Sequence, residues 1–225
     1  MLPEPDLQKS TLITGAAALG TPITEAQADT LLAYQALLQR WNKVYNLTAI
    51  RDPAQMLVQH LLDSLTVLAP LDRWLAQRSA HAGVTSPRLL DVGSGGGLPG
   101  VVIAVLRPAV AVTCVDTVGK KATFVRQVAA ELRLPNLQAR HARVEDLAEP
   151  PFGVITARAF ASLDDLVALT RPLLAPGGCW MAMKGQHPIT EIAALPADID
   201  LFHVEPLHVP GLDAERCLIW MRPQA

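Results

Sequence analysis

Short apolar runs alternate with amphipathic stretches from residue 88 onward. The apolar runs predict strands near residues 88–93, 110–116, 136–140, 152–157 and 178–184. Apolar residues at helical spacing predict helices near 98–106, 119–133, 163–174 and 188–195. Two later apolar runs, 201–209 and 217–221, are joined by a turn-like sequence and predict a terminal antiparallel hairpin. The alternation indicates an α/β fold with a doubly wound, mostly parallel sheet.

The first 78 residues have a helical pattern instead. Thr24 to Gln27 has the form of a capping box, in which two side chains satisfy backbone groups at a helix start. Core-facing residues then recur at helical spacing: Leu31, Tyr34, Leu38 and Trp41. We therefore expect an N-terminal helical region over residues 1–78, packed on the core. A linker over 79–87 and a sheet domain over 88–225 would follow.

The first strand of the sheet runs directly into a glycine cluster. Residues 95–100 fit G-x-G-x-x-G, the dinucleotide fingerprint. Gly93, Gly95 and Gly97, preceded by Asp91, also resemble the first motif of S-adenosylmethionine-dependent methyltransferases. Glycines at this point let a cofactor lie against bare backbone at the carboxyl edge of the sheet. A tight strand–helix connection without a ligand remains an alternative at this stage.

Acidic residues after the next two strands narrow the choice of cofactor. Asp116 ends the second strand, where a carboxylate accepts hydrogen bonds from the ribose hydroxyls of an adenosine cofactor. NAD enzymes and methyltransferases both use such an acid. Residues 143–147 bring further acids after the third strand, where methyltransferases place an acidic or polar group at the adenine edge. Acids after strands one, two and three favour S-adenosylmethionine.

These residues closely resemble one family, the bacterial small-subunit ribosomal RNA guanine-N7 methyltransferases, also called glucose-inhibited division protein B. The likeness covers nearly the whole chain, and its most specific parts are absent from general methyltransferases. One small departure is Ala157, where the family pattern has a serine before the arginine. The matching segments are 41–48, 60–64, 91–100, 116–121, 143–145, 158–160 and 184–186.

The resemblance implies a Rossmann-like class I methyltransferase fold with seven strands and S-adenosylmethionine as cofactor. The cofactor loop would be shaped by Gly93, Gly95, Gly97 and Leu98. Asp116 would bind the ribose, while Val144 and Glu145 would flank the adenine. Arg158 follows the fourth strand and suits the methionine carboxylate or an RNA phosphate; the resemblance favours the carboxylate.

The reaction implied by the family is methyl transfer to N7 of a guanosine in 16S ribosomal RNA. Guanine N7 has an in-plane lone pair and no proton, so this transfer needs no general base. Residues 155–160 stand where amine-methylating enzymes carry an Asn-Pro-Pro-Tyr type motif. The alternatives are a methyltransferase for another RNA or a small molecule, and a non-catalytic RNA-binding protein with a vestigial cofactor fold.

The formal net charge of −2 hides a basic stretch between residues 117 and 143. It holds six basic residues and one acid, Glu131, which leaves +5. A cluster of this kind is typical of a surface for a phosphate backbone. Lys184, which ends the fifth strand, suits a phosphate or the guanine O6. The residues expected to bind RNA are Lys43, Lys120, Lys121, Arg140 and Lys184.

Composition favours a cytoplasmic enzyme, and the resemblance implies that its partner is 16S ribosomal RNA or the small ribosomal subunit. Arg107 and Pro108 interrupt the longest apolar segment, so no membrane span is expected. Three widely spaced cysteines in apolar strands indicate buried thiols and a reducing compartment. His60 and Asp63 lie one helical turn apart, but two ligands do not make a metal site, and an interhelical hydrogen bond is expected instead. We expect a monomer that binds neither DNA nor metal.

Overall fold

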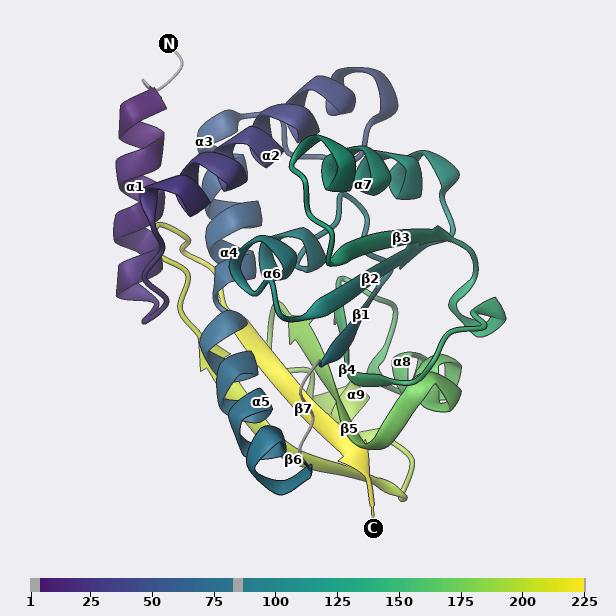
Figure 1. The fold of residues 1–225 in the computed structure, drawn as a ribbon. Helices are drawn as coiled ribbons and strands as arrows, with labels where there is room; N and C mark the ends of the chain where they lie inside the picture. Colours follow the sequence, from purple (N-terminus) through teal and green to yellow (C-terminus); the bar gives the residue numbers. More distant parts are fainter. Residues whose placement is uncertain (1–4, 83–86, 225) are drawn as a thin grey trace.

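The computed structural model describes residues 5–82 and 87–224 (Figure 1). A seven-stranded sheet with the order β3-β2-β1-β4-β5-β7-β6 runs through the middle of the molecule. The first five strands are mutually parallel, and β7 is antiparallel to both β5 and β6. The strands are β1 (Arg88–Val92), β2 (Ala111–Asp116), β3 (Leu137–His141), β4 (Phe152–Arg158), β5 (Leu174–Lys184), β6 (Ile199–Leu207) and β7 (Arg216–Pro223).

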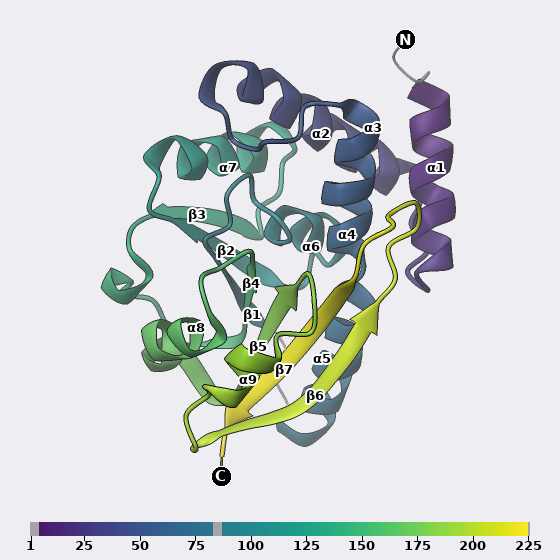
Figure 2. The ribbon, with the colours of Figure 1, turned by 180° about the vertical axis from the view of Figure 1, so that it is seen from behind.

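The sheet confirms the predicted doubly wound α/β class and the terminal hairpin. Helices cover both of its faces, as the two opposite views show (Figures 1 and 2). The helices after β1 are α6 (Gly100–Leu106), α7 (Gly119–Glu131), η2 (Val144–Asp146), α8 (Leu163–Thr170), η3 (Arg171–Leu173) and α9 (Ile189–Ala193). The helix predicted over 163–174 is therefore split, because Pro172 lies in the short η3 and ends the regular α8.

The N-terminal region is helical, as predicted. Its elements are α1 (Pro5–Ala18), α2 (Glu25–Tyr45), α3 (Pro53–Met56), the π-helix η1 (Leu57–Leu62), α4 (Asp63–Leu65) and α5 (Leu68–Ala82). The predicted capping box is present: the Thr24 side chain accepts from the Gln27 backbone, and the Gln27 side chain accepts from Thr24 N–H. The helix ends at Asn46, which adopts the left-handed conformation.

Three predicted boundaries are wrong. The linker expected over 79–87 begins too early, because α5 continues through the alanine-rich residues to Ala82; residues 83–86 lie outside the described residues. The helix expected from residue 98 begins at Gly100, since Leu98 still belongs to the turn that bonds back to Ser94. The fifth strand begins four residues early, at Leu174, and its pairing with β4 shifts register near Phe152.

One hydrophobic core joins the N-terminal helices to the sheet. Buried side chains of α1, α2 and η1, such as Leu12, Leu38 and Leu61, belong to the same cluster as Val101 of α6 and Phe124 of α7. A second cluster on the opposite face joins the sheet to α8. All three cysteines are free and buried, as the sequence predicts. The described helices include none long and apolar enough to cross a membrane.

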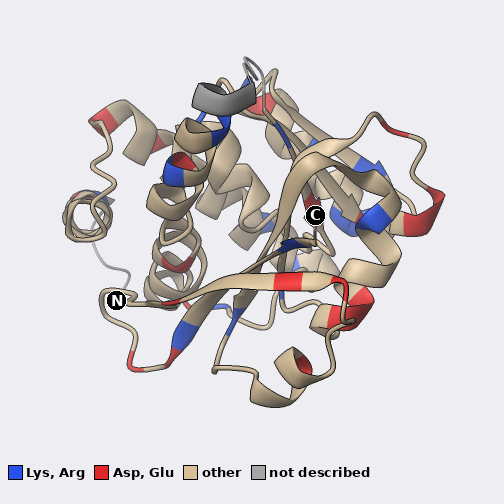
Figure 3. Ribbon diagram, turned by 90° about the horizontal axis from the view of Figure 1, so that it is seen from below, with Lys and Arg blue, Asp and Glu red and all other residues tan. Residues whose placement is uncertain are grey.

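Seen from below, acidic and basic segments are interspersed along the strands and helices (Figure 3). The opposite side carries the loops after β1, β2, β4 and β5, together with the ends of α2 and η1 (Figure 1). These loops and the N-terminal helices enclose the candidate site.

Candidate functional site

Two adjoining hollows lie at the carboxyl ends of the parallel strands. The smaller, about 370 Å³, is lined by the loops after β1, β2 and β3, and we call it the sheet-edge hollow. The larger, about 530 Å³, lies between the glycine loop, the N-terminal helices and the ends of β4, β5 and β7, and we call it the helix-walled hollow. Gly93 and Lys121 line both. The pair therefore forms one continuous site.

The glycine loop needs its glycines for two different reasons. Gly93, Gly95 and Gly97 all have positive φ, a conformation that disfavours other residues. A Cβ on Gly97 would approach Val101 Cγ2 to 2.5 Å, so this glycine is required by packing. A Cβ on Gly95 would meet nothing closer than the Gly93 carbonyl at 4.0 Å. Gly95 therefore keeps its backbone accessible in the helix-walled hollow, where a ligand can approach closely.

Asp116 holds the glycine loop against the end of β2. Its carboxylate accepts a hydrogen bond from Gly95 N at 2.9 Å and another from Val118 N at 2.8 Å. Lys121 Nζ lies 3.7 Å from the same carboxylate. Asp116 also lines the sheet-edge hollow, so it lies at the strand end where a ribose-binding acid is expected.

Val144 and Glu145 lie in the short helix η2 and line the same sheet-edge hollow as Asp116. Arg143 Nη2 donates to Glu145 Oε1 at 2.7 Å, and this hydrogen bond lowers the pKa of Glu145. Val144 is buried and contributes an apolar surface. An apolar contact next to a carboxylate is suited to the face and edge of a purine ring.

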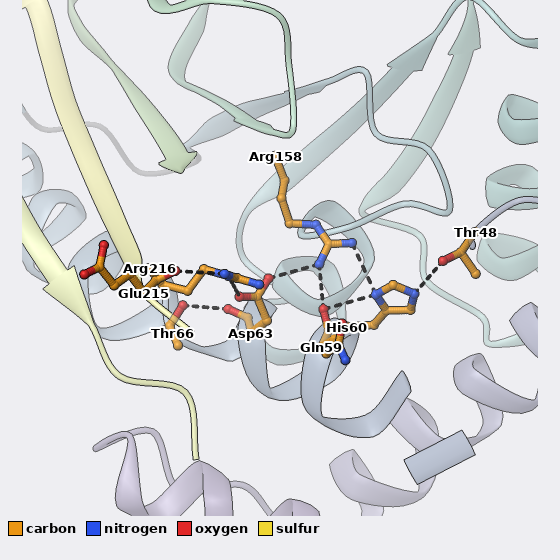
Figure 4. Close-up of polar contacts among 8 residues, drawn as sticks. All are labelled: Thr48, Gln59, His60, Asp63, Thr66, Arg158, Glu215 and Arg216. Atoms are coloured by element: carbon orange, nitrogen blue, oxygen red, sulfur yellow. Dashed lines mark hydrogen bonds and ion pairs between the residues drawn. The ribbon is translucent and has the colours of Figure 1, made fainter. Parts of the chain in front are cut away.

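Asp63 joins two arginines from distant parts of the chain at the helix-walled hollow (Figure 4). Arg158 Nη1 lies 3.0 Å from Asp63 Oδ2, and Arg216 Nε lies 2.8 Å from Oδ1. The Asp63 side chain is only 3% exposed. Two guanidinium groups thus share one buried carboxylate, which leaves an excess of positive charge at the hollow. Such an excess favours an anionic group on the ligand.

The π-helix η1 fixes Arg158 and His60 relative to each other (Figure 4). The Gln59 carbonyl accepts from Arg158 Nη1 at 3.0 Å and lies 3.1 Å from His60 Nδ1. With Nδ1 as the donor, His60 Nε2 accepts from the Thr48 hydroxyl at 2.9 Å. Burial, followed by the nearby Arg158, lowers the pKa of His60 to about 4. The imidazole is therefore neutral near pH 7. The interhelical hydrogen bond expected here is not found: His60 bonds to Thr48 in the loop after α2 and to Gln59 of its own helix, and Asp63 forms ion pairs.

Asp91 lies beneath the glycine loop rather than in either hollow. Its Oδ2 accepts from Gly100 N at 2.8 Å, which supports the start of α6. Its Oδ1 has no hydrogen-bond partner among the described residues, and complete burial raises the pKa of this carboxyl to about 7. The acid of the first motif is thus a buried group that supports the loop.

The residues expected to bind RNA are dispersed. Lys121 lies between the two hollows, and Lys184 lines the helix-walled hollow with its amine 2.7 Å from Glu191. Lys120 and Lys43 are exposed, on α7 and α2 respectively. Arg140 lies on β3, 2.7 Å from Glu149, and lines neither hollow. The structure therefore brings only two of these five residues to the site.

Sequence reasoning missed several residues of the helix-walled hollow. Arg216, Thr48 and Gln59 all line it. Thr48 belongs to segment 41–48, which matches the family pattern, but the sequence assigns no function to this residue. Tyr34 was expected only as a core residue, but its hydroxyl donates to the Gly96 carbonyl at 2.7 Å. The helix α2 thereby supports the glycine loop directly.

The fold and the glycine loop define a Rossmann-like class I methyltransferase. The crystal structure of TrmN from Thermus thermophilus is similar with a TM-score of 0.53 and 21% identity, covering 74% of this chain and 53% of that one. A ribosomal protein L11 methylase from Lactobacillus delbrueckii subsp. bulgaricus has a TM-score of 0.51 and 14% identity, covering 68% of this chain and 78% of that one. At such identities the likeness concerns the fold alone.

Sequence comparison identifies the family within this class. The family model described as rRNA small subunit methyltransferase G matches residues 27–219. A relative named ribosomal RNA small subunit methyltransferase G from Leptothrix cholodnii is 72% identical over 99% of this chain and 98% of its own. One of the same name from Acidovorax sp. is 60% identical over 94% and 93%. The chain belongs to the rRNA small subunit methyltransferase G family, which confirms the resemblance.

Proposed function

We propose that this protein transfers a methyl group from S-adenosylmethionine to N7 of a guanosine in 16S ribosomal RNA of the small subunit. Family membership over almost the full chain supports ribosomal RNA as the substrate class. The two hollows support S-adenosylmethionine as the cofactor. The ion pairs and hydrogen bonds of the polar side chains support guanine N7 as the acceptor atom.

The hollows fit an adenosine joined to an amino acid. Val144 and Glu145 would hold the adenine, and Asp116 would accept hydrogen bonds from the ribose in the sheet-edge hollow. The methionine part would pass the accessible backbone of Gly95 into the helix-walled hollow. There the excess positive charge of Arg158 and Arg216 suits its carboxylate or an RNA phosphate. When bound, the cofactor supplies a methyl group on a positively charged sulfur.

One observation favours an acceptor atom without a proton. The titratable side chains of the helix-walled hollow are already engaged: Asp63 by two arginines, His60 by Thr48, and Lys184 by Glu191. Guanine N7 suits such a site, because its lone pair attacks without the help of a base. The protein then contributes alignment of the base with the methyl group and a fixed electrostatic environment.

The test is methylation of small ribosomal subunits, or of their naked RNA, from cells that lack this protein. Incubation with S-adenosylmethionine should yield 7-methylguanosine, detected by mass spectrometry of nucleosides and located by cleavage at N7-methylated positions. Methylation at another atom, or of another RNA only, would contradict the proposal. Cofactor binding without transfer to any RNA would instead indicate a small-molecule substrate, and failure to bind the cofactor would indicate a vestigial site.

A further inference from the structure

The last turn of α2 and the segment after it form a corner at the edge of the helix-walled hollow, which we call the α2 corner (residues 40–51). The buried side chain of Asn42 donates to Ile50 O at 3.2 Å and accepts from Thr48 N at 2.9 Å. Asn46 caps α2 in the left-handed conformation, and its side chain accepts from Arg51 at 3.1 Å. These bonds tie both ends of the segment together.

The α2 corner has a pocket side and a solvent side. Leu47, Thr48 and Ile50 line the helix-walled hollow. In contrast, Val44 is 69% exposed and Tyr45 41% exposed, although both are large and apolar enough to be buried in most proteins. The same short segment thus shapes the site and presents an apolar, aromatic surface beside it.

The ring of Tyr45 packs against other aromatic rings. Its ring centroid lies 5.2 Å from that of Trp41, which in turn lies 5.5 Å from Phe124 of α7. The end of α2 accordingly lies alongside α7 in both ribbon views (Figures 1 and 2). An aromatic ring that is packed on a rigid base and still exposed can accept a further planar group at little entropic cost.

The stretch of sequence that carries the Tyr45 ring has a net positive charge. Between residues 30 and 62 the basic residues are Arg40, Lys43 and Arg51 and the only acid is Asp52, so three minus one leaves +2. No carboxylate among the described residues lies within ion-pair distance of Arg40 or Lys43. Exposed aromatic rings flanked by free cations are typical of surfaces that bind unpaired nucleotides.

We propose that the α2 corner binds an unpaired nucleotide adjacent to the target guanosine, with Tyr45 stacked on its base and Lys43 beside its phosphate. This inference rests on the proposed function, since it takes RNA as the substrate. Stacking suits a position next to the reacting base, because sequence-specific enzymes reach single-stranded RNA whose bases are splayed apart. The corner continues directly into the wall of the hollow, so a neighbouring nucleotide can contact both.

The experiment measures binding of unmethylated 16S ribosomal RNA, and separately of complete small subunits, over a series of salt concentrations. Tyr45→Ala should weaken binding of both by about 5- to 100-fold without changing the salt dependence, since stacking releases no counterions. Tyr45→Phe should bind like the wild type. Lys43→Glu should instead flatten the log–log salt dependence by about one unit. S-adenosylmethionine affinity and thermal melting should stay unchanged in all three variants.

Leu7→Ala is the matched control, because Leu7 is also exposed (59%) but lies on α1, away from the corner. Unchanged RNA binding by Tyr45→Ala would overturn the proposal. So would weakened binding to complete subunits but not to naked RNA, which would indicate a protein contact. Loss of self-association by Tyr45→Ala would point to a second copy of this chain. If Tyr45→Ala binds RNA normally and still methylates N7, nucleotide binding by the α2 corner is refuted, whereas the proposed function is not.

Discussion

The sheet-edge hollow and the helix-walled hollow meet at Gly93 and Lys121 but are assembled differently. The first is built from successive strand–loop units, with lining residues between Val92 and Leu169. The second collects residues from Leu38 to Arg216, almost the whole length of the chain. Under the proposed function, the adenosine part of the cofactor would therefore bind in a hollow that is local in sequence, while its methionine part and the acceptor base would share a hollow that depends on tertiary packing. Substitutions on the two sides should differ accordingly.

The largest effect is expected at Gly95, on the glycine loop. Gly95→Asp should abolish S-adenosylmethionine binding while the protein stays folded, because the new carboxylate would occupy the accessible space and lie near Asp116. Isothermal titration measures the binding. Gly20→Asp is the control: Gly20 also has positive φ and has nothing within 4 Å of a built Cβ. Near-normal cofactor affinity in Gly95→Asp would remove the basis of the cofactor assignment.

Replacing Asp63, which lines the helix-walled hollow, should mainly lower the free energy of unfolding. Asp63→Asn removes the charge that pairs with Arg158 and Arg216, and loss of one partner of a buried ion pair costs roughly 3 kcal/mol. Urea unfolding measures this loss. Asp72→Asn is the comparison, since the Asp72 side chain is 45% exposed and its pair with Arg107 should contribute at most about 1 kcal/mol. Equal losses in the two variants would contradict the importance of burial.

Asp116 tests the sheet-edge side. Asp116→Ala should weaken S-adenosylmethionine binding by about 1–3 kcal/mol, because Gly95 N and Val118 N lose their shared acceptor and the ribose loses its partner. Equilibrium dialysis with labelled cofactor is suitable. NAD should not bind measurably to the wild type. Tight NAD binding would instead support the dinucleotide interpretation of residues 95–100.

Variants of two adjacent lysines should distinguish effects on cofactor binding from effects on RNA binding. Lys120 and Lys121 are both expected to bind RNA, but Lys121 also lies 3.7 Å from Asp116. Lys121→Glu should therefore weaken both cofactor and RNA binding. Lys120→Glu should affect RNA alone, with a salt dependence smaller by about one unit. If both variants keep the wild-type salt dependence, these lysines are not RNA contacts.

The last expected effect concerns pH and Asp91, and it changes stability without changing binding. The native carboxyl has a pKa of about 7 against an ordinary 3.8, so between these values the folded state binds more protons. Its contribution to stability is present below about pH 4 and is lost as pH rises to about 7. Asp91→Asn should lack this decline.

Unfolding of the wild type and Asp91→Asn across this window provides the measurement. His60 acts in the opposite direction, because its lowered pKa makes stability rise with pH between about 4 and 6.5. That contribution is common to both proteins and cancels in their difference. Identical pH dependence would show that Asp91 is ionised in the folded protein.

The cofactor loop could be predicted because its determinants are neighbours in the sequence. Gly93 follows β1 directly, Gly95 lies two residues further on and Asp116 ends β2, and parallel strands bring their carboxyl ends to one edge. The Asp63–Arg216 pair joins residues 153 positions apart, and no spacing rule relates them. The predicted start of the linker at residue 79 is wrong for a simpler reason. Small residues that are common in loops can also extend a helix, as they do in α5.

The core shared by the N-terminal helices and the sheet also governs when the chain can fold during synthesis. Leu12 and Leu38 leave the ribosome early, yet they are buried with Val101 and Phe124, which are made much later. The first helices can pack on one another, but their contacts with α6 and α7 form only once α7 has emerged. Domains generally fold as units during translation. This protein consequently completes its core only after more than half of the chain has been synthesised.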